Sequence, residues 1–195
     1  LLDRQLYNRF GGPPIPGEAT FPSAEVDITV KDGDSLYLSG RDYTFLHLPG
    51  HSPGSMAVVD RAKGFYVVGD SPQGRGSGRP LLFHDAKEYE ASMLRLASEP
   101  IGTLVLGHPF PPLEKPVLED GEARLHAEES LTAIRELVSN VQGALCEVKK
   151  PRTLEEIQAR LPGVQRITLG CVLEALTREG KAMTRKVDGR PMWQQ

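Results

Sequence analysis

Short apolar segments separated by turn residues predict several β-strands in the first half of the chain. Apolar and polar residues alternate over residues 26–30, Lys31-Asp32-Gly33-Asp34 supplies a turn, and residues 36–38 continue as a second strand, so we expect a hairpin here. Each later strand ends near a Gly, Asp or His, which places polar groups at the strand ends. These later strands are predicted over residues 43–48, 55–59, 65–68 and 103–106.

Helical spacing of apolar residues marks two segments of the same region. Residues 85–98 place apolar side chains at helical intervals, and residues 121–141 carry an apolar stripe opposite a charged face. Residues 1–24 are rich in Pro and Gly and are predicted to form a surface loop. Strands and helices together indicate the fold class α/β, or α+β.

Residues 144–195 are predicted to form a second, small domain after residues 1–143. Thr153-Leu154-Glu155-Glu156 is a capping box that begins a helix, and Pro162-Gly163 ends it. A second helix follows, because apolar residues recur at i, i+3, i+4 and i+7 in Leu169, Val172, Leu173 and Leu176.

A β-hairpin is predicted to close the chain after Gly180, the expected C-cap of the second helix. Its strands, residues 183–187 and 191–194, are joined by the turn pair Asp188-Gly189. Trp193 is expected to anchor this hairpin in the small core. Helix, helix and hairpin in this order describe a winged-helix-like tail.

Composition indicates a soluble globular protein of 195 residues with 39% hydrophobic and 25% charged residues. No apolar run approaches the roughly 18 residues that span a bilayer, and no targeting signal opens the sequence. Two cysteines are too few for a disulfide framework, so we expect the cytoplasm or another reducing compartment. Residue 1 is Leu, and we expect a truncated chain.

Three polar residues follow three of the predicted strands and form the chemically informative set. His51 lies in Pro49-Gly50-His51-Ser52, Asp70 ends Val68-Gly69-Asp70, and His108 ends Leu106-Gly107-His108. Neutral imidazole and carboxylate are zinc ligands, so three strand ends at a common rim could bind a metal. Taken singly, each histidine fits a structural role equally well, and Gly69-Asp70 fits a simple turn.

These segments resemble the metallo-β-lactamase-fold hydrolases. The segment His47-Leu48-Pro49-Gly50-His51-Ser52 resembles their H-T-P-G-H-T segment, residues 65–70 resemble the F-x-G-D strand end, and residues 106–108 resemble P-G-H-G. The resemblance covers residues 25–140. It implies a partial αββα sandwich that lacks its N-terminal part, followed by the winged-helix-like tail.

The resemblance also implies a metal centre with two zinc ions or other divalent metals. His51 would bind the first metal, Asp70 would bridge both, and His108 would bind the second. A water bound to two such cations is activated for attack near neutral pH.

One family segment, H-x-H-x-D-H, is absent from this sequence. Only about two protein ligands then remain for each metal, whereas catalytic zinc usually has about three. We therefore expect weak or absent metal binding, an inactive isolated chain, and catalytic residues in the missing N-terminal part. A sheet edge and a core face would be exposed, so self-association or a missing N-terminal half is the expected partner.

Other polar residues of the chain are expected to lie outside the metal site. The loop at residues 74–80 lacks a phosphate-loop signature and is expected to be a mobile rim loop beside Asp70. His126, in a charged helix, is expected to be solvated. His84 resembles no catalytic residue, and His47 is expected to be a core or surface histidine.

Three functions remain open at this stage. The first is hydrolysis of a thioester, ester or similar bond in a small-molecule substrate, because the fold alone does not fix the substrate. The second is an endoribonuclease acting on single-stranded RNA, since residues 149–195 carry 10 basic against 5 acidic residues. The third is a non-catalytic half-fold that serves as a binding module. The candidate RNA-binding residues are Lys149, Lys150, Arg152, Arg166, Arg178, Lys181, Arg185 and Lys186.

Overall fold

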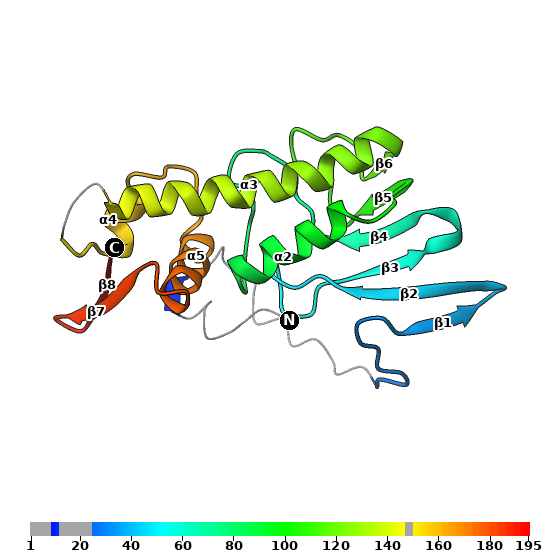
Figure 1. Cartoon of the computed structure of the whole chain (residues 1–195), viewed down its shortest axis with the longest axis horizontal. Coiled ribbons are helices and arrows are strands. Elements are labelled where there is room, and N and C mark those ends of the chain that lie inside the picture. Colours follow the sequence, from blue (N-terminus) through cyan, green and yellow to red (C-terminus); the bar gives the residue numbers. More distant parts are fainter. Residues whose placement is uncertain (1–8, 12–24, 147–149) are drawn as a thin grey trace.

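A six-stranded sheet with two helices on one face forms the larger part of the structure (Figure 1). The computed structural model describes residues 9–11, 25–146 and 150–195. Neighbouring strands are antiparallel except β4 and β5, which are parallel. In order across the sheet, the strands are β1 (Ser35–Leu38), β2 (Arg41–His47), β3 (Met56–Asp60), β4 (Phe65–Gly69), β5 (Thr103–Leu106) and β6 (Val117–Glu119).

The two long helices bury the inner face of this sheet. Helix α2 (Ala86–Ala97) is the crossover that a parallel strand pair requires, and it joins β4 to β5. Helix α3 (Asp120–Cys146) follows β6 and packs along α2. Both predicted helices are confirmed, and α3 continues past residue 141. The core between sheet and helices contains Leu46, Val59, Tyr66, Val68, Leu104, Leu118, Tyr89, Met93, Leu96 and Ile134.

The predicted strand over residues 26–30 is wrong. Val26 and Ile28 are 68% and 63% exposed, and residues 26–30 form no strand. The hairpin lies one step later, between β1 and β2, and turns at Ser39-Gly40, where both φ angles are positive. Two central residues with positive φ match the twist of antiparallel strands. Residues 26–30 alternate in polarity but form no strand, because no neighbouring strand in the described part of the chain pairs with them.

The outer face of the sheet carries a continuous apolar row. Backbone register places Phe45 opposite Val58, Val58 opposite Val67, Val67 opposite Val105, and Val105 opposite Val117. Val67 and Val117 are 40% and 41% exposed, although Val67 lies on a central strand. A partly exposed apolar face of this kind is expected of an αββα sandwich that lacks its N-terminal part.

The tail follows the predicted order of elements. It contains α4 (Leu154–Gln158), α5 (Arg166–Arg178), β7 (Met183–Val187) and β8 (Arg190–Gln194), with β7 and β8 paired. The capping box at Thr153 is present, and Trp193 is fully buried as expected. Helix α4 ends before Pro162-Gly163. The winged-helix assignment stays a prediction, as does the division at residue 143, which lies inside α3.

The C-cap of α5 explains how the hairpin leaves the helix. Gly180 has a φ of 70°, its N–H donates to the carbonyl of Thr177, and the next N–H donates to that of Leu176. These bonds are the glycine-based Schellman arrangement, which an L side chain at Gly180 would strain. The prediction that Gly180 ends this helix is therefore confirmed, with Glu179 as the C-cap and Gly180 as the left-handed residue directly after it.

The tail packs on the larger part through α5. The backbone N–H of Leu82 donates to the Thr168 hydroxyl at 3.0 Å, and both residues are buried. Phe10, predicted to lie in a surface loop, is only 2% exposed, because its ring packs against Gly170 and Trp193. The rest of that predicted loop, except Arg9 and Gly11, lies outside the described residues. In the part of the chain that the structure describes, no helix has the length and apolarity to cross a membrane.

Candidate functional site

Sheet topology brings the three sequence-predicted residues to one edge. Strand β2 is antiparallel to β3, and β3 is antiparallel to β4, so β2 runs in the direction of β4 and of its parallel neighbour β5. His51 follows β2, Asp70 follows β4, and His108 follows β5. Their strands therefore all end at the same side of the sheet, where ligands of layered α/β folds commonly bind.

Asp70 and His108 are in direct contact. Nδ1 of His108 lies 2.7 Å from Oδ1 of Asp70, and the side chains of His108 and Asp70 are 67% and 25% exposed, respectively. Gly107 makes this possible, because a Cβ there would lie 2.5 Å from the Asp70 Oδ1. Its N–H also donates to the Gly69 carbonyl at 2.8 Å, which holds the two strand ends together.

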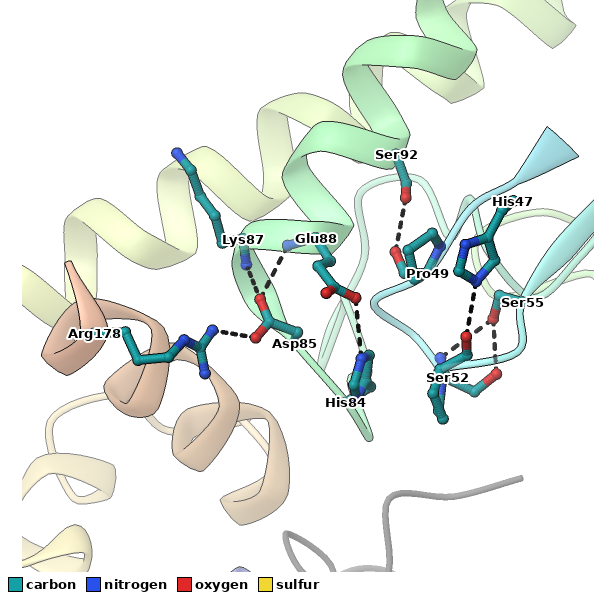
Figure 2. A network of polar contacts seen from close by, with 11 residues as sticks. His47, Pro49, Ser52, Ser55, His84, Asp85, Lys87, Glu88, Ser92 and Arg178 are labelled. Atoms are coloured by element: carbon teal, nitrogen blue, oxygen red, sulfur yellow. Dashed lines mark hydrogen bonds and ion pairs between the residues drawn. The ribbon is translucent and has the colours of Figure 1, made fainter. Parts of the chain in front are cut away.

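The loop that carries His51 is pressed against α2. Gly50 has a φ of 128°, and a Cβ at this position would overlap the backbone of Tyr89. The Ser92 hydroxyl donates to the Pro49 carbonyl at 2.8 Å, which anchors the same loop to the helix (Figure 2). The loop can lie this close to the helix only because residue 50 has no side chain, and this explains the glycine that precedes His51.

His51 is held by a backbone carbonyl. Its Nδ1 lies 2.8 Å from the carbonyl oxygen of Leu81, and its ring meets the Phe83 ring edge-on. Burial lowers the pKa of His51, and the Leu81 carbonyl and the Asp70 carboxylate oppose this shift only in part. The imidazole is thus predominantly neutral near pH 7, which is the form that can bind a metal.

The three side chains match a metal in kind but not in number. Imidazole and carboxylate suit zinc, yet in residues 9–11, 25–146 and 150–195 no group of three His, Cys, Asp or Glu side chains could hold a metal ion. Asp70 and His108 touch each other, whereas His51 interacts with both only electrostatically. A metal at this rim would need donors from another segment or chain.

Arg79 adds a cation that the sequence interpretation did not single out. Its guanidinium lies 3.9 Å from the centre of the Phe110 ring, two residues after His108. Burial lowers the pKa of Arg79, and the Asp70 carboxylate opposes that shift. The loop at residues 74–80 does bring Arg79 near Asp70, as expected, while its mobility stays a prediction. The contact between Arg79 and Phe110 joins two distant segments and has no local sequence signal.

The prediction that His126 is solvated is wrong. It is 4% exposed, and its ring faces Gly74, where a Cβ would approach it to 2.7 Å. Its Nε2 lies 3.4 Å from the Pro72 carbonyl oxygen, and burial lowers its pKa. His126 therefore packs α3 against the loop that follows Asp70.

The two remaining histidines lie near α2. His47 is half-buried, between the core and surface environments that were expected, and its Nε2 lies 2.9 Å from the Pro53 carbonyl oxygen. His84 pairs with Glu88 at 3.0 Å (Figure 2). Both contacts are structural and neither residue joins the Asp70 rim.

Internal contacts reduce the candidate RNA-binding surface of the tail. The assignment of Arg152 is wrong, because it is 2% exposed and donates to the Ala144 carbonyl. Lys149 lies outside the described residues. The exposed Lys150, Arg185 and Lys186 stay predictions. Three more pair with carboxylates of this chain, namely Arg166 with Glu155, Arg178 with Asp85 and Lys181 with Glu179.

Together these features define a layered α/β protein with a His and Asp rim at the carboxyl ends of its strands. The chain belongs to the metallo-beta-lactamase superfamily, whose family model matches residues 2–108, more than half of the sequence. The matched region ends at His108 and contains all three rim residues.

Curated relatives match about half of the chain. A hydroxyacylglutathione hydrolase from Yersinia pestis (strain Pestoides F) is 33% identical over 100 residues, which are 51% of this chain and 39% of that protein. One from Hamiltonella defensa is 28% identical over 107 residues, or 54% of this chain and 42% of that protein. The matches thus span less than half the length of these relatives.

Solved structures share the fold over a longer stretch. A metallo-beta-lactamase family protein from Thermus thermophilus has a TM-score of 0.70 at 22% identity, covering 98% of this chain and 63% of its own. A beta-lactamase domain protein from Burkholderia ambifaria has a TM-score of 0.67 at 18% identity, covering 85% and 51%. The first likeness extends through nearly the whole chain, including most of the tail.

Proposed function

We propose that this chain is part of a metal-dependent hydrolase that cleaves a thioester, ester or similar bond of a small molecule. The observation that carries the proposal is the convergence of His51, Asp70 and His108 at one edge of the sheet. The hydroxyacylglutathione hydrolases, at 33% identity over 100 residues, support an acylated thiol as the substrate class. The complete site requires ligands that the described residues do not bring together.

Each rim residue has a distinct role in this proposal. Neutral His51 offers a ring nitrogen, Asp70 offers the carboxylate oxygen that is not engaged by His108, and His108 offers its second nitrogen. Two zinc ions bound there would supply an activated water and polarise the bond under attack. Gly107 keeps Asp70 and His108 close enough to serve one centre.

Arg79 is the residue that we propose for binding an anionic group of the substrate. It interacts electrostatically with Asp70 and His51, and the Phe110 ring restricts its guanidinium. A preoriented guanidinium binds a carboxylate with little loss of side-chain freedom. Replacement by methionine should therefore raise KM more than it lowers kcat.

The test compares three variants in a full-length protein that includes the missing metal ligands. Asp70→Ala should lower thioester hydrolysis more than His51→Ala, because a bridging carboxylate serves two cations whose mutual repulsion it offsets. Lys181→Ala, in the tail, should leave hydrolysis unchanged. Wild-type turnover in Asp70→Ala would remove the basis of the proposal.

The same full-length protein, with one further variant, tests the two alternatives. Cleavage of single-stranded RNA, with no thioester or ester hydrolysis, would favour an endoribonuclease; Lys186→Ala should then weaken binding and its salt dependence. A full-length protein without any hydrolytic activity, but with a ligand retained by the tail, would favour a binding module. The single tail tryptophan is fully buried, so the described tail lacks a tryptophan platform for base stacking.

A further inference from the structure

Gln73 is a buried polar residue three positions after Asp70, with an exposed fraction of 2%. Its side-chain amide pairs with both backbone groups of one residue across the loop, Leu81. Oε1 accepts from the Leu81 N–H at 2.8 Å, and Nε2 donates to the Leu81 carbonyl at 3.0 Å. The second Nε2 hydrogen goes to the Asp70 carbonyl at 3.1 Å.

These partners fix which way the amide of Gln73 faces. An amide flipped by 180° would place its oxygen against two carbonyl oxygens, those of Leu81 and Asp70. It would also place its NH₂ group against the Leu81 N–H. The observed orientation satisfies one acceptor and both donors of a buried side chain, as burial requires.

The Leu81 carbonyl that Gln73 holds also binds His51. Nδ1 of His51 lies 2.8 Å from this oxygen, which has no hydrogen to donate, so Nδ1 must carry the proton. Gln73 Nε2 lies 3.1 Å from the same Nδ1, but both of its hydrogens already point to carbonyls. In neutral His51 the lone pair therefore remains on Nε2.

Helix α3 anchors the backbone of this clamp. The Ser130 hydroxyl accepts from the N–H groups of Gln73 and Gly74 at 3.1 and 2.8 Å, and it donates to the His126 carbonyl at 2.7 Å. Ser130 is fully buried. The position of Gln73 is thus set by a rigid helix as well as by its own side chain.

We propose that Gln73 is a positioning residue that fixes the tautomer and ring orientation of His51 through the Leu81 carbonyl. Gln73 acts on both His51 and Asp70, because its side chain also donates to the Asp70 carbonyl. The tautomer follows from the described contacts alone, whereas the use of Nε2 as a metal ligand rests on the proposed function. Groups that orient a metal-binding histidine in this way commonly change metal affinity by about 10- to 100-fold.

The first test is the tautomer of His51 in this chain, measured by two-bond proton–nitrogen NMR at pH 8. The wild type should show a proton on Nδ1 and none on Nε2. Gln73→Leu should shift His51 toward a mixture of tautomers. Gln158→Leu is the matched control, because Gln158 Nε2 also donates to a backbone carbonyl, that of Val164, but far from the rim. It should leave the His51 signals unchanged.

Two results would overturn the proposal. One is an Nε2–H tautomer in the wild type, a result that does not depend on whether any variant folds. The other is an unchanged His51 signal in a folded Gln73→Leu protein. Gln73→Glu gives a second variant, since it replaces the Nε2 donor by an oxygen facing two carbonyls, and should also disturb the tautomer.

A second readout separates this proposal from the proposed function. In the full-length protein, Gln73→Leu should weaken zinc binding about 10-fold or more, measured by competition with a chelator. Unchanged zinc affinity would refute the positioning of a ligand. Absence of hydrolysis in the wild type would refute the proposed function and leave the tautomer result intact.

Discussion

Arg178 of α5 forms an ion pair with Asp85, whose carboxylate also caps the first turn of α2 (Figure 2). One carboxylate oxygen accepts from the N–H groups of Lys87 and Glu88 at 2.8 and 3.0 Å, and the other faces the guanidinium. The Asp85 side chain is only 10% exposed. A single residue therefore begins a core helix and fastens the tail to it, which couples the folding of both parts.

Substitutions at Asp85 should separate the cap from the ion pair. Asp85→Ala should cost about 1–2 kcal/mol, because it removes both, whereas Asp85→Asn keeps a good cap and should cost less. Arg178→Ala should cost about 0.5 kcal/mol, since its side chain is 57% exposed and screened by solvent. Urea unfolding of the three variants measures these differences. Equal losses in Asp85→Asn and Asp85→Ala would show that the cap is unimportant.

Gly50 should tolerate no side chain. Gly50→Ala combines a positive φ with an overlap with the Tyr89 backbone, so it should destabilise the fold by about 2 kcal/mol or more. Gly143→Ala is the matched control, because Gly143 lies in α3 with no neighbour within 4 Å of the added Cβ. It should stabilise the helix by about 0.5–1 kcal/mol. Thermal unfolding measures both effects. Melting temperatures that shifted in the same direction in Gly50→Ala and Gly143→Ala would contradict this account.

The parts of the fold with local signals could be predicted from the sequence. The capping box at Thr153, the cap glycine Gly180 and the turn pair Asp188-Gly189 lie where local chemistry predicts them. The rim residues were found through the resemblance of their strand-end motifs to those of metallo-β-lactamase-fold hydrolases, because each strand end taken singly fits a structural role or a simple turn. The turn at Ser39-Gly40 was missed, since a positive φ at Ser39 leaves little trace in the sequence.

Contacts between distant segments could not be predicted in the same way. The burial of His126 depends on the loop at Gly74 lying against α3, and the stacking of Arg79 depends on Phe110. Gln73 gains its partners only when residue 81 folds back beside it. Periodicity placed His126 on a polar helix face, but three-dimensional packing determines which polar faces meet solvent.

Stability should fall as the pH falls below about 6.5, the usual pKa of histidine. Burial lowers the pKa values of His126 and His51 in the folded chain, so the unfolded chain takes up protons first. The stability contribution is complete above the ordinary pKa and is lost as the pH falls through the lowered folded value. His126→Gln should reduce the slope of unfolding free energy between about pH 7 and pH 5.

A neighbouring change on the same helix gives the control for that experiment. Leu125 is 54% exposed and does not titrate, so Leu125→Gln should keep the wild-type slope. Urea unfolding at several pH values supplies the measurement. An unchanged slope in His126→Gln would show that His126 is not a source of the pH dependence.

The chain should associate through the outer face of its sheet. Val67→Lys places a charge in the centre of the apolar row and should shift the chain toward monomer. Leu94→Lys, on α2, adds the same charge at a residue that is 53% exposed outside the row, and should leave association unchanged. Sedimentation velocity over a range of concentrations makes the comparison. A wild-type monomer at high concentration would contradict both the exposed face and the half-sandwich interpretation.

Zinc should bind this chain only weakly. His51 and the pair of Asp70 and His108 offer suitable donors, but no three of the described metal-binding side chains gather around one point. Binding zinc with fewer than about three protein ligands leaves most of its coordination to water, which is a weak arrangement. Calorimetric titration should give a dissociation constant in the micromolar range or weaker, and Asp70→Ala should abolish what binding there is. Glu88→Ala is the control, because it removes a carboxylate that pairs with His84 away from the rim. Submicromolar binding of two zinc ions per chain would show that the ligand set is complete without any further segment.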